Sequence, residues 1–336
     1  MEIAKPYLLF LGDVQDDLAA KTAHGIVDWR PEWCMGQLRL AGCRADCRIA
    51  ELSIPDAVAK GVRTMIVGVV NAGGVLPTHW IDTIVAAIEA GLDVATGLHR
   101  RLSSVPAIAA AAQGRGRQLF DVRFSDTQFT TGSGAKRSGW RLLTVGTDCS
   151  VGKKYTALAL EREMVAQGIK AEFRATGQTG ILIAGRGVAI DAVVADFISG
   201  AAEWLSPDNE ADHWDVVEGQ GSLFHPSFAG VTLGLLHGTQ PDAFVVCHEP
   251  TRTKMRGVQH TLPTIGEVID RTIAEGRLTN AAIRCIGIAI NTEHLGKAEA
   301  QRELEATADK YSLPCVDPIR TGVKPLVAEL SRQFGA

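Results

Sequence analysis

Residues 145–156 have the sequence V-G-T-D-C-S-V-G-K-K-Y-T, and this stretch constrains the fold more than any other part of the chain. The apolar run at 140–146 before it predicts a strand, and the run at 155–167 after it predicts a helix. The two glycines and the first lysine have the G-x-x-x-x-G-K spacing of a phosphate-binding loop. Glycines let successive N–H groups face one space at a helix N-terminus, where the helix dipole favours an anion. The sequence therefore predicts an anion-binding loop in an α/β domain.

The residue after the first lysine differs from that of nucleotide hydrolases. Those enzymes normally have Ser or Thr there, and its hydroxyl binds magnesium. Here the residue is Lys154, which cannot ligate a cation, and Thr156 projects from another side of the helix. The loop is therefore predicted to hold a diphosphate, which favours coenzyme A, with ATP binding left open. The residues expected to bind the carrier are Gly146, Thr147, Ser150, Val151, Gly152, Lys153 and Lys154.

Composition and charge limit the class of protein. The chain has 336 residues, enough for two domains, and a net charge of −4 without a basic stretch, which argues against nucleic-acid binding. The N-terminus lacks the layout of a signal peptide, and no apolar run reaches membrane-spanning length. The seven cysteines are scattered, which favours reduced thiols. We expect a cytoplasmic enzyme that forms a homo-oligomer and has no membrane or nucleic-acid partner.

Strands alternate with helices along the whole chain, which indicates parallel sheets. Residues 130–139 have linker composition, so we place one domain at 1–132 and a second at 133–336. The predicted strands are 7–11, 64–70 and 93–97 in the first domain, and 140–146, 171–175, 214–217, 243–247, 283–290 and 314–317 in the second. Residues at first-domain strand ends are ligand contacts or ordinary turns: Gly12, Asn71, Gly73, Gly74, His99, Arg100 and Arg101.

Two segments of the second domain are similar to dethiobiotin synthetase and related P-loop enzymes. The loop G-T-D-C-S-V-G-K is similar to their G-T-D-T-x-V-G-K-T, and Glu218-Gly-Gln-Gly221 is similar to their E-G-A-G-G segment. In such folds the strand at 214–217 lies beside the strand that ends at Gly146, which would bring Glu218 to the phosphate loop. The departures are Lys154 and the additional N-terminal domain.

A second resemblance covers essentially the full chain. The loop, A-T-G-Q-T-G, V-V-E-G-Q-G-S-L and H-E-P-T-R together resemble the D-glutamate N-acetyltransferase family (DgcN type), formerly a domain of unknown function. The resemblance implies a Rossmann-like N-terminal domain followed by a P-loop NTPase-like domain. It also implies transfer of acetyl from acetyl-CoA to the amine of a D-amino acid, D-glutamate above all, in D-amino acid catabolism. We expect no metal requirement, because Lys154 replaces the hydroxyl that holds magnesium.

Such a transfer needs a proton acceptor, because only an unprotonated amine attacks a thioester. Glu218 and His225 are the first candidates and Asp148 is the third, because an anion in the loop repels phosphate unless it serves the amine. Glu218 is equally well a vestigial magnesium partner, and His225 a packing residue. The substrate carboxylates need cations, so the candidate substrate contacts are Gln178, Thr179, Arg252, Lys254 and Arg256, which a turn or a solvated surface also explains.

Two other functions compete with this hypothesis. A ligase or kinase of the dethiobiotin synthetase type would need Mg-ATP, which Lys154 disfavours. A non-enzymatic sensor of nucleotides or CoA would leave Glu218 and the arginines without a chemical role. Cys149 invites an acyl-cysteine mechanism, but no histidine is adjacent to it in sequence, so direct transfer between the two substrates is the simpler hypothesis.

Overall fold

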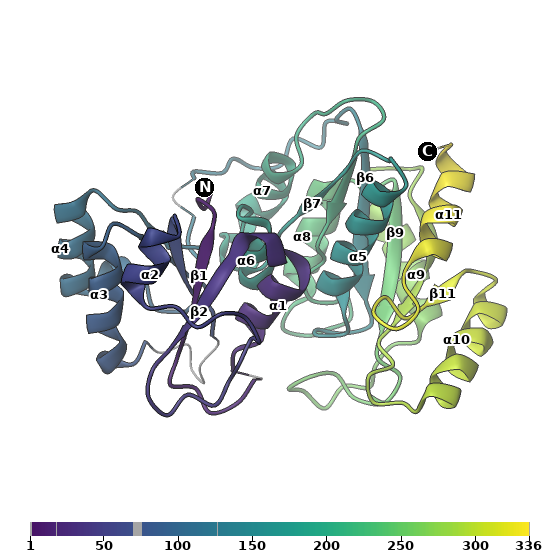
Figure 1. The fold of residues 1–336 in the computed structure, drawn as a ribbon. Coiled ribbons are helices and arrows are strands. Elements are labelled where there is room, and N and C mark those ends of the chain that lie inside the picture. Colours follow the sequence, from purple (N-terminus) through teal and green to yellow (C-terminus); the bar gives the residue numbers. More distant parts are fainter. Residues whose placement is uncertain (1, 18, 70–75, 126, 336) are drawn as a thin grey trace. The chain divides into compact units, whose positions relative to one another are not determined.

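The computed structural model describes residues 2–17, 19–69, 76–125 and 127–335. Asn71, Gly73 and Gly74 lie outside these residues. The chain forms two compact units, Met1–Thr127 with Gly177–Ala192, and Gln128–Thr176 with Val193–Ala336. Each unit is described by itself below (Figure 1).

The first unit is built on a parallel sheet with strand order β2-β1-β3-β4-β5. Its central strands β1, β3 and β4 are buried along their whole length, as expected for strands covered on both faces. The strands are β1 (Tyr7–Gly12), β2 (Cys34–Arg39), β3 (Thr64–Val67), β4 (Asp93–Thr96) and β5 (Leu119–Asp121). The helices are α1 (Lys21–Trp29), α2 (Ile54–Ala59), α3 (Ile81–Glu89), α4 (Pro106–Arg115) and α6 (Gln178–Ala184).

The second unit is built on a parallel sheet with strand order β11-β10-β9-β6-β8-β7. The strands are β6 (Trp140–Gly146), β7 (Ala171–Arg174), β8 (Trp214–Val217), β9 (Ala243–His248), β10 (Arg284–Ile290) and β11 (Cys315–Val316). The central strand β6 lies between β8 and β9, so the prediction that β8 neighbours the strand ending at Gly146 is confirmed. The carboxyl ends of these three strands therefore meet at one edge of the sheet.

Helices cover this second sheet in two groups. Helices α5 and α11 pack against each other and against strands, and α8 packs against both α7 and α9. From β6 the chain first adds strands toward one edge of the sheet and then toward the other. Because crossovers between parallel strands are right-handed, this change places helices on both faces of the sheet. The helices are α5 (Lys153–Ala166), α7 (Ile198–Leu205), α8 (Ala229–Thr239), α9 (Ile265–Gly276), α10 (Lys297–Tyr311) and α11 (Lys324–Phe334). Among the described residues, no helix is both long and apolar enough to cross a membrane.

The segment 130–139, which has the composition of a linker, is anchored to the second unit. It has no regular secondary structure, but the Arg137 guanidinium is buried and donates to the carbonyl oxygens of Ser206, Gly238 and Thr239. The contact-based division lies between residues 127 and 128, and it assigns α6 to the first unit. The boundary at residues 132 and 133 remains our proposal for the domain limits.

Candidate active site

The phosphate-binding loop connects β6 to α5 at the carboxyl edge of the second sheet. Gly152 precedes the helix with φ +103°, a left-handed conformation that glycine adopts without strain. A Cβ added there would meet nothing within 4 Å, so this side of the backbone faces open space. Because α5 is 14 residues long, its first N–H groups and its dipole favour an anion at this point. The loop has the features that bind a phosphate.

The two lysines after Gly152 have different surroundings. The Lys153 ammonium is buried and donates to the carbonyl oxygen of Asp148 at 2.7 Å, and burial lowers its pKa. The Lys154 ammonium lies 4.4 Å from the centre of the Tyr155 ring. The Thr156 hydroxyl donates to the carbonyl oxygen of Gly152 at 3.0 Å, so it serves its own helix.

Asp148 is fully buried, and one of its carboxylate oxygens is held by the segment that follows β9. Oδ2 accepts from the Arg252 guanidinium at 3.2 Å and from the Arg256 backbone N–H at 2.7 Å. Arg252 also donates to the carbonyl oxygens of Cys149 at 2.8 Å and Ser150 at 2.7 Å. The Arg256 side chain donates to the Ser150 hydroxyl. Two arginines thus fix the conformation of the phosphate-binding loop.

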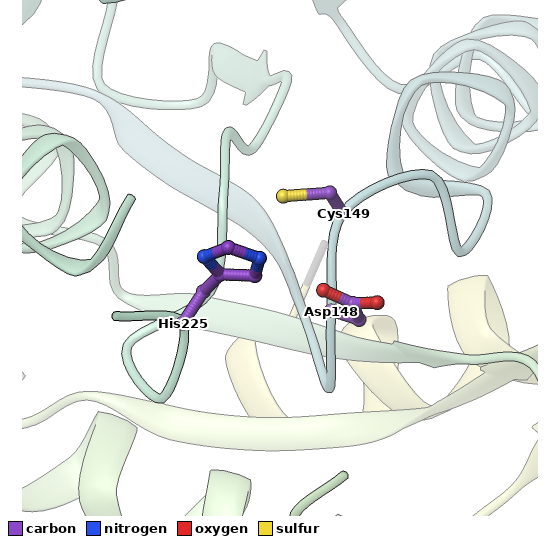
Figure 2. Close-up of side chains that lie close together, drawn as sticks. All are labelled: Asp148, Cys149 and His225. Atoms are coloured by element: carbon purple, nitrogen blue, oxygen red, sulfur yellow. The ribbon is translucent and has the colours of Figure 1, made fainter. Parts of the chain in front are cut away.

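The structure brings His225 close to the loop, although His225 lies far from Cys149 in the sequence. A carboxylate oxygen of Asp148, the sulfur of Cys149 and a ring nitrogen of His225 all lie within 4.8 Å of one another, so these three residues could together ligate a metal ion (Figure 2). His225 Nδ1 accepts from the Ser227 N–H at 3.1 Å, so Nε2 carries the proton and donates to the Arg256 carbonyl oxygen at 3.0 Å. Either a metal ion or a general-base role would require one of these bonds to break. Burial raises the pKa of the Cys149 thiol, which disfavours the thiolate that a nucleophile or metal ligand needs.

Glu218 follows β8 and is buried at the same edge of the sheet. Its Oε2 accepts from the Thr176 N–H at 3.0 Å, and its carbonyl oxygen accepts from the Thr176 hydroxyl at 2.6 Å. The Gln220 amide donates to the same hydroxyl at 3.0 Å. A Cβ at Gly219 would lie 1.7 Å from the Thr144 carbonyl oxygen, so only glycine fits between the two strand ends. These contacts join the A-T-G-Q-T-G and E-G-Q-G segments.

Three predicted substrate contacts have hydrogen-bond partners outside the phosphate-binding loop. Gln178 and Thr179 belong to α6 of the first unit, where the Gln178 side-chain oxygen accepts from Arg123 and the Thr179 hydroxyl pairs with that of Thr22. The Lys254 ammonium is exposed and donates to Gln259. The structure therefore groups Arg252 and Arg256 with the phosphate-binding loop, whereas these three residues have other partners.

Residues without a predicted role also support the loop. The Thr147 hydroxyl pairs with His248 Nδ1 at 3.0 Å, and burial lowers the pKa of His248. The Ser222 hydroxyl donates to the Thr147 carbonyl oxygen at 3.2 Å. The buried Glu249 carboxylate lies 3.1 Å from Arg252 Nε. His248 and Glu249 belong to the H-E-P-T-R segment, so its position at a strand end was the available signal.

Comparison with protein families matches both halves of the chain. Residues 38–125 match the Rossmann-like domain of a family described as a domain of unknown function (DUF1611_N). Residues 128–327 match the P-loop domain of the same family (DUF1611_C). The predicted fold class, a Rossmann-like domain followed by a P-loop domain, is confirmed by these matches and by the two parallel sheets.

Similar proteins extend over the full length. A D-glutamate N-acetyltransferase of Tritonibacter scottomollicae is 51% identical over 98% of this chain and 99% of its own. A D-glutamate N-acetyltransferase of a Pseudoalteromonas species is 50% identical over 98% of this chain and 100% of its own. The crystal structure of a DUF1611 family protein from Anabaena variabilis is 28% identical, covers 97% of this chain and 99% of its own, and superposes with a TM-score of 0.83.

Proposed function

The chain belongs to the DUF1611 family, and we propose that it is an N-acetyltransferase that moves acetyl from acetyl-CoA to the amine of D-glutamate. The observation that carries this proposal is the identity of about half of all residues, over nearly the full length, to two D-glutamate N-acetyltransferases. We further propose that the protein acts in D-amino acid catabolism, in the cytoplasm, as a homo-oligomer.

The phosphate-binding loop supports CoA as the acetyl carrier. The open face at Gly152, the N-terminus of α5 and the two lysines suit the CoA diphosphate. Acetyl transfer breaks a carbon–sulfur bond, so the phosphates only have to be bound. We therefore propose that Gly146, Thr147, Ser150, Val151, Gly152, Lys153 and Lys154 hold the diphosphate without a metal ion.

The remaining site residues receive roles that follow from the chemistry of acetyl transfer. Glu218, His225 and Asp148 are the proposed proton acceptors at the sheet edge, and Arg256, Lys254, Gln178 and Thr179 are proposed substrate contacts. Arg252 belongs to the proposed substrate contacts as well, but its Nε, Nη1 and Nη2 atoms all face protein oxygens in this structure. A bound carboxylate would have to replace some of those contacts.

The proposal is tested with purified protein and acetyl-CoA in EDTA. D-Glutamate should release free CoA thiol with a matching yield of N-acetyl-D-glutamate, whereas L-glutamate and other D-amino acids should react more slowly. No thiol release with any amine would overturn the acetyltransferase assignment. Turnover of Mg-ATP with loss of all activity in EDTA would favour the ligase or kinase instead.

A further inference from the structure

One buried polar atom in the candidate active site has no hydrogen-bond partner among the described residues, namely Oδ1 of Asp148. Asp148 is 0% exposed, and its other oxygen is held from two directions by Arg252 and Arg256. An unsatisfied acceptor in a buried carboxylate costs stability, so a fold that retains one needs an explanation. A ligand that donates a hydrogen bond to Oδ1 would satisfy it.

The surroundings of Asp148 favour a ligand with an N–H donor. Arg252 provides one positive charge for the carboxylate but approaches only Oδ2. The neighbouring side chains cannot replace a ligand at Oδ1, because His225 directs its proton to the Arg256 carbonyl oxygen, and the Cys149 thiol is a weak donor. An ammonium group offers up to three N–H donors and the opposite charge, which makes it a strong partner for a buried carboxylate oxygen.

The other two candidate bases are less suited to this role. His225 uses both ring nitrogens in bonds to the backbone. Glu218 Oε2 accepts from the Thr176 N–H, and its carbonyl oxygen accepts from the Thr176 hydroxyl. Glu218 thus joins the ends of two neighbouring strands. The contacts favour Asp148, which the sequence ranks third.

We propose that Asp148 Oδ1 binds the ammonium group of the acceptor amino acid and takes the proton that makes the amine nucleophilic. This inference rests on the proposed acetyl transfer. The ammonium gives one proton to Oδ1, and the freed nitrogen lone pair forms a bond to the acetyl carbonyl carbon. The carbon–sulfur bond then breaks with its electrons on sulfur. The sulfur receives the proton from Asp148, and the second nitrogen proton passes to solvent, which leaves an amide, a CoA thiol and one proton.

The test compares two ligands on two proteins. D-Glutamate has the ammonium group, and D-2-hydroxyglutarate has a hydroxyl in its place with the same carboxylates. Asp148→Asn keeps an oxygen for Arg252 and for the Arg256 N–H but removes the charge. We expect this substitution to weaken D-glutamate binding roughly 10- to 100-fold, the range for a charged hydrogen bond, and D-2-hydroxyglutarate binding less than about threefold. Calorimetry in EDTA with CoA present measures both affinities, and thiol release should fall in parallel.

Asp215→Asn is the matched control. Asp215 is also buried, accepts a hydrogen bond from the Ser206 hydroxyl and forms an ion pair with Arg174. It lies within β8 rather than in the loop. This variant should keep the preference for D-glutamate over the hydroxy acid. If Asp148→Asn does not fold, Asp148→Ser also removes the charge, and the ratio of the two ligand affinities is compared with that of the wild type.

The outcomes separate this inference from the proposed function. A wild-type protein that releases no thiol with acetyl-CoA and D-glutamate would overturn the proposed function. A wild-type protein that turns over, with an Asp148→Asn variant that keeps its activity and its preference for the ammonium ligand, would overturn the role of Asp148 alone. Equal weakening of both ligands would show that Asp148 only maintains the loop, and would also overturn that role.

Discussion

Replacement of Arg252 by Ala should destabilise the phosphate-binding loop, because this side chain contacts four other residues. Its guanidinium reaches the Asp148 and Glu249 carboxylates at 3.2 and 3.1 Å, and the carbonyl oxygens of Cys149 and Ser150 at 2.8 and 2.7 Å. Both carboxylates are at least 96% buried, so the substitution leaves two buried anions without their cation. Removal of one partner from a buried ion pair costs about 3–5 kcal/mol. The Arg252 side chain is 26% exposed, so we expect a loss of about 3 kcal/mol, the lower end of that range.

Two further variants of the same segment calibrate this value. Lys254→Ala removes an exposed cation whose ammonium bonds only to Gln259 among the contacts described, so stability should change by less than about 0.5 kcal/mol. Arg252→Lys keeps the charge but loses the planar fork that spans two carbonyl oxygens, so the loss should be about 1–3 kcal/mol. Urea denaturation measures the free energy of unfolding. Hydrogen exchange of peptides from 140–167 locates the change in the loop.

The result that would refute this reasoning is specific. If Arg252→Ala unfolds at the same urea concentration as Lys254→Ala, and exchange at 140–167 is unchanged, then Arg252 does not hold the loop. If Arg252→Ala is stable and loses only D-glutamate affinity, Arg252 instead binds a substrate carboxylate, as its charge in the sequence suggests.

Three further predictions concern residues around the same loop. Lys153→Ala should weaken CoA binding by about 1.5–3 kcal/mol in calorimetry with excess EDTA, the range for a charged hydrogen bond; unchanged affinity would place the diphosphate elsewhere. Glu218→Gln keeps an oxygen for the Thr176 N–H, so kcat should stay within about tenfold, whereas a loss of roughly 10²–10⁴ would make Glu218 the general base instead of Asp148. Gly219→Ala places a Cβ 1.7 Å from a backbone oxygen. Overpacking typically costs about 1–3 kcal/mol, and we expect a loss of stability at the upper end of this range. Gly230→Ala in α8, where a Cβ would meet nothing within 4 Å, should instead stabilise by about 0.5–1 kcal/mol, and equal unfolding free energies for these two variants would contradict the steric argument.

The sequence predicted those parts of the site that local pattern determines. The glycine and lysine spacing, with a strand before it and a helix after it, locates the phosphate-binding loop. The predicted start of the following helix is within two residues of the observed start of α5. The position of β8 beside β6 followed from the topology of P-loop folds. Strand β2 is not predicted, because C-M-G-Q-L-R has neither an apolar run nor a clear alternation. Helix α6 is not predicted either, because glycines at 177 and 180 are typical of loops.

The contacts that distinguish the candidate residues could not be predicted in the same way. Arg252 and Asp148 are 104 residues apart, and nothing in either local pattern indicates that one guanidinium would approach a single oxygen of that carboxylate. The same holds for His225, because the two backbone groups that occupy its nitrogens belong to different segments. Sequence gives the residue types at a sheet edge, whereas the state of each oxygen and nitrogen depends on packing across the sheet.

The distribution of charge in the loop supports a phosphate-binding fold that performs its chemistry away from the phosphates. In nucleotide hydrolases a hydroxyl after the loop lysine holds magnesium, which neutralises charge as a phosphate bond breaks. Here Lys154 occupies that position, and the Thr156 hydroxyl donates to the Gly152 carbonyl oxygen. The loop also contains an anion of its own, Asp148, which Arg252 holds through one oxygen only. The carboxylate alone does not distinguish this loop from an ATP-binding one, because the similar G-T-D-T-x-V-G-K-T loop of dethiobiotin synthetase has an aspartate at the same position, whereas Lys154 does distinguish it. For a carrier whose reacting bond is a thioester, the same carboxylate can serve a cationic amine while the phosphates remain bound.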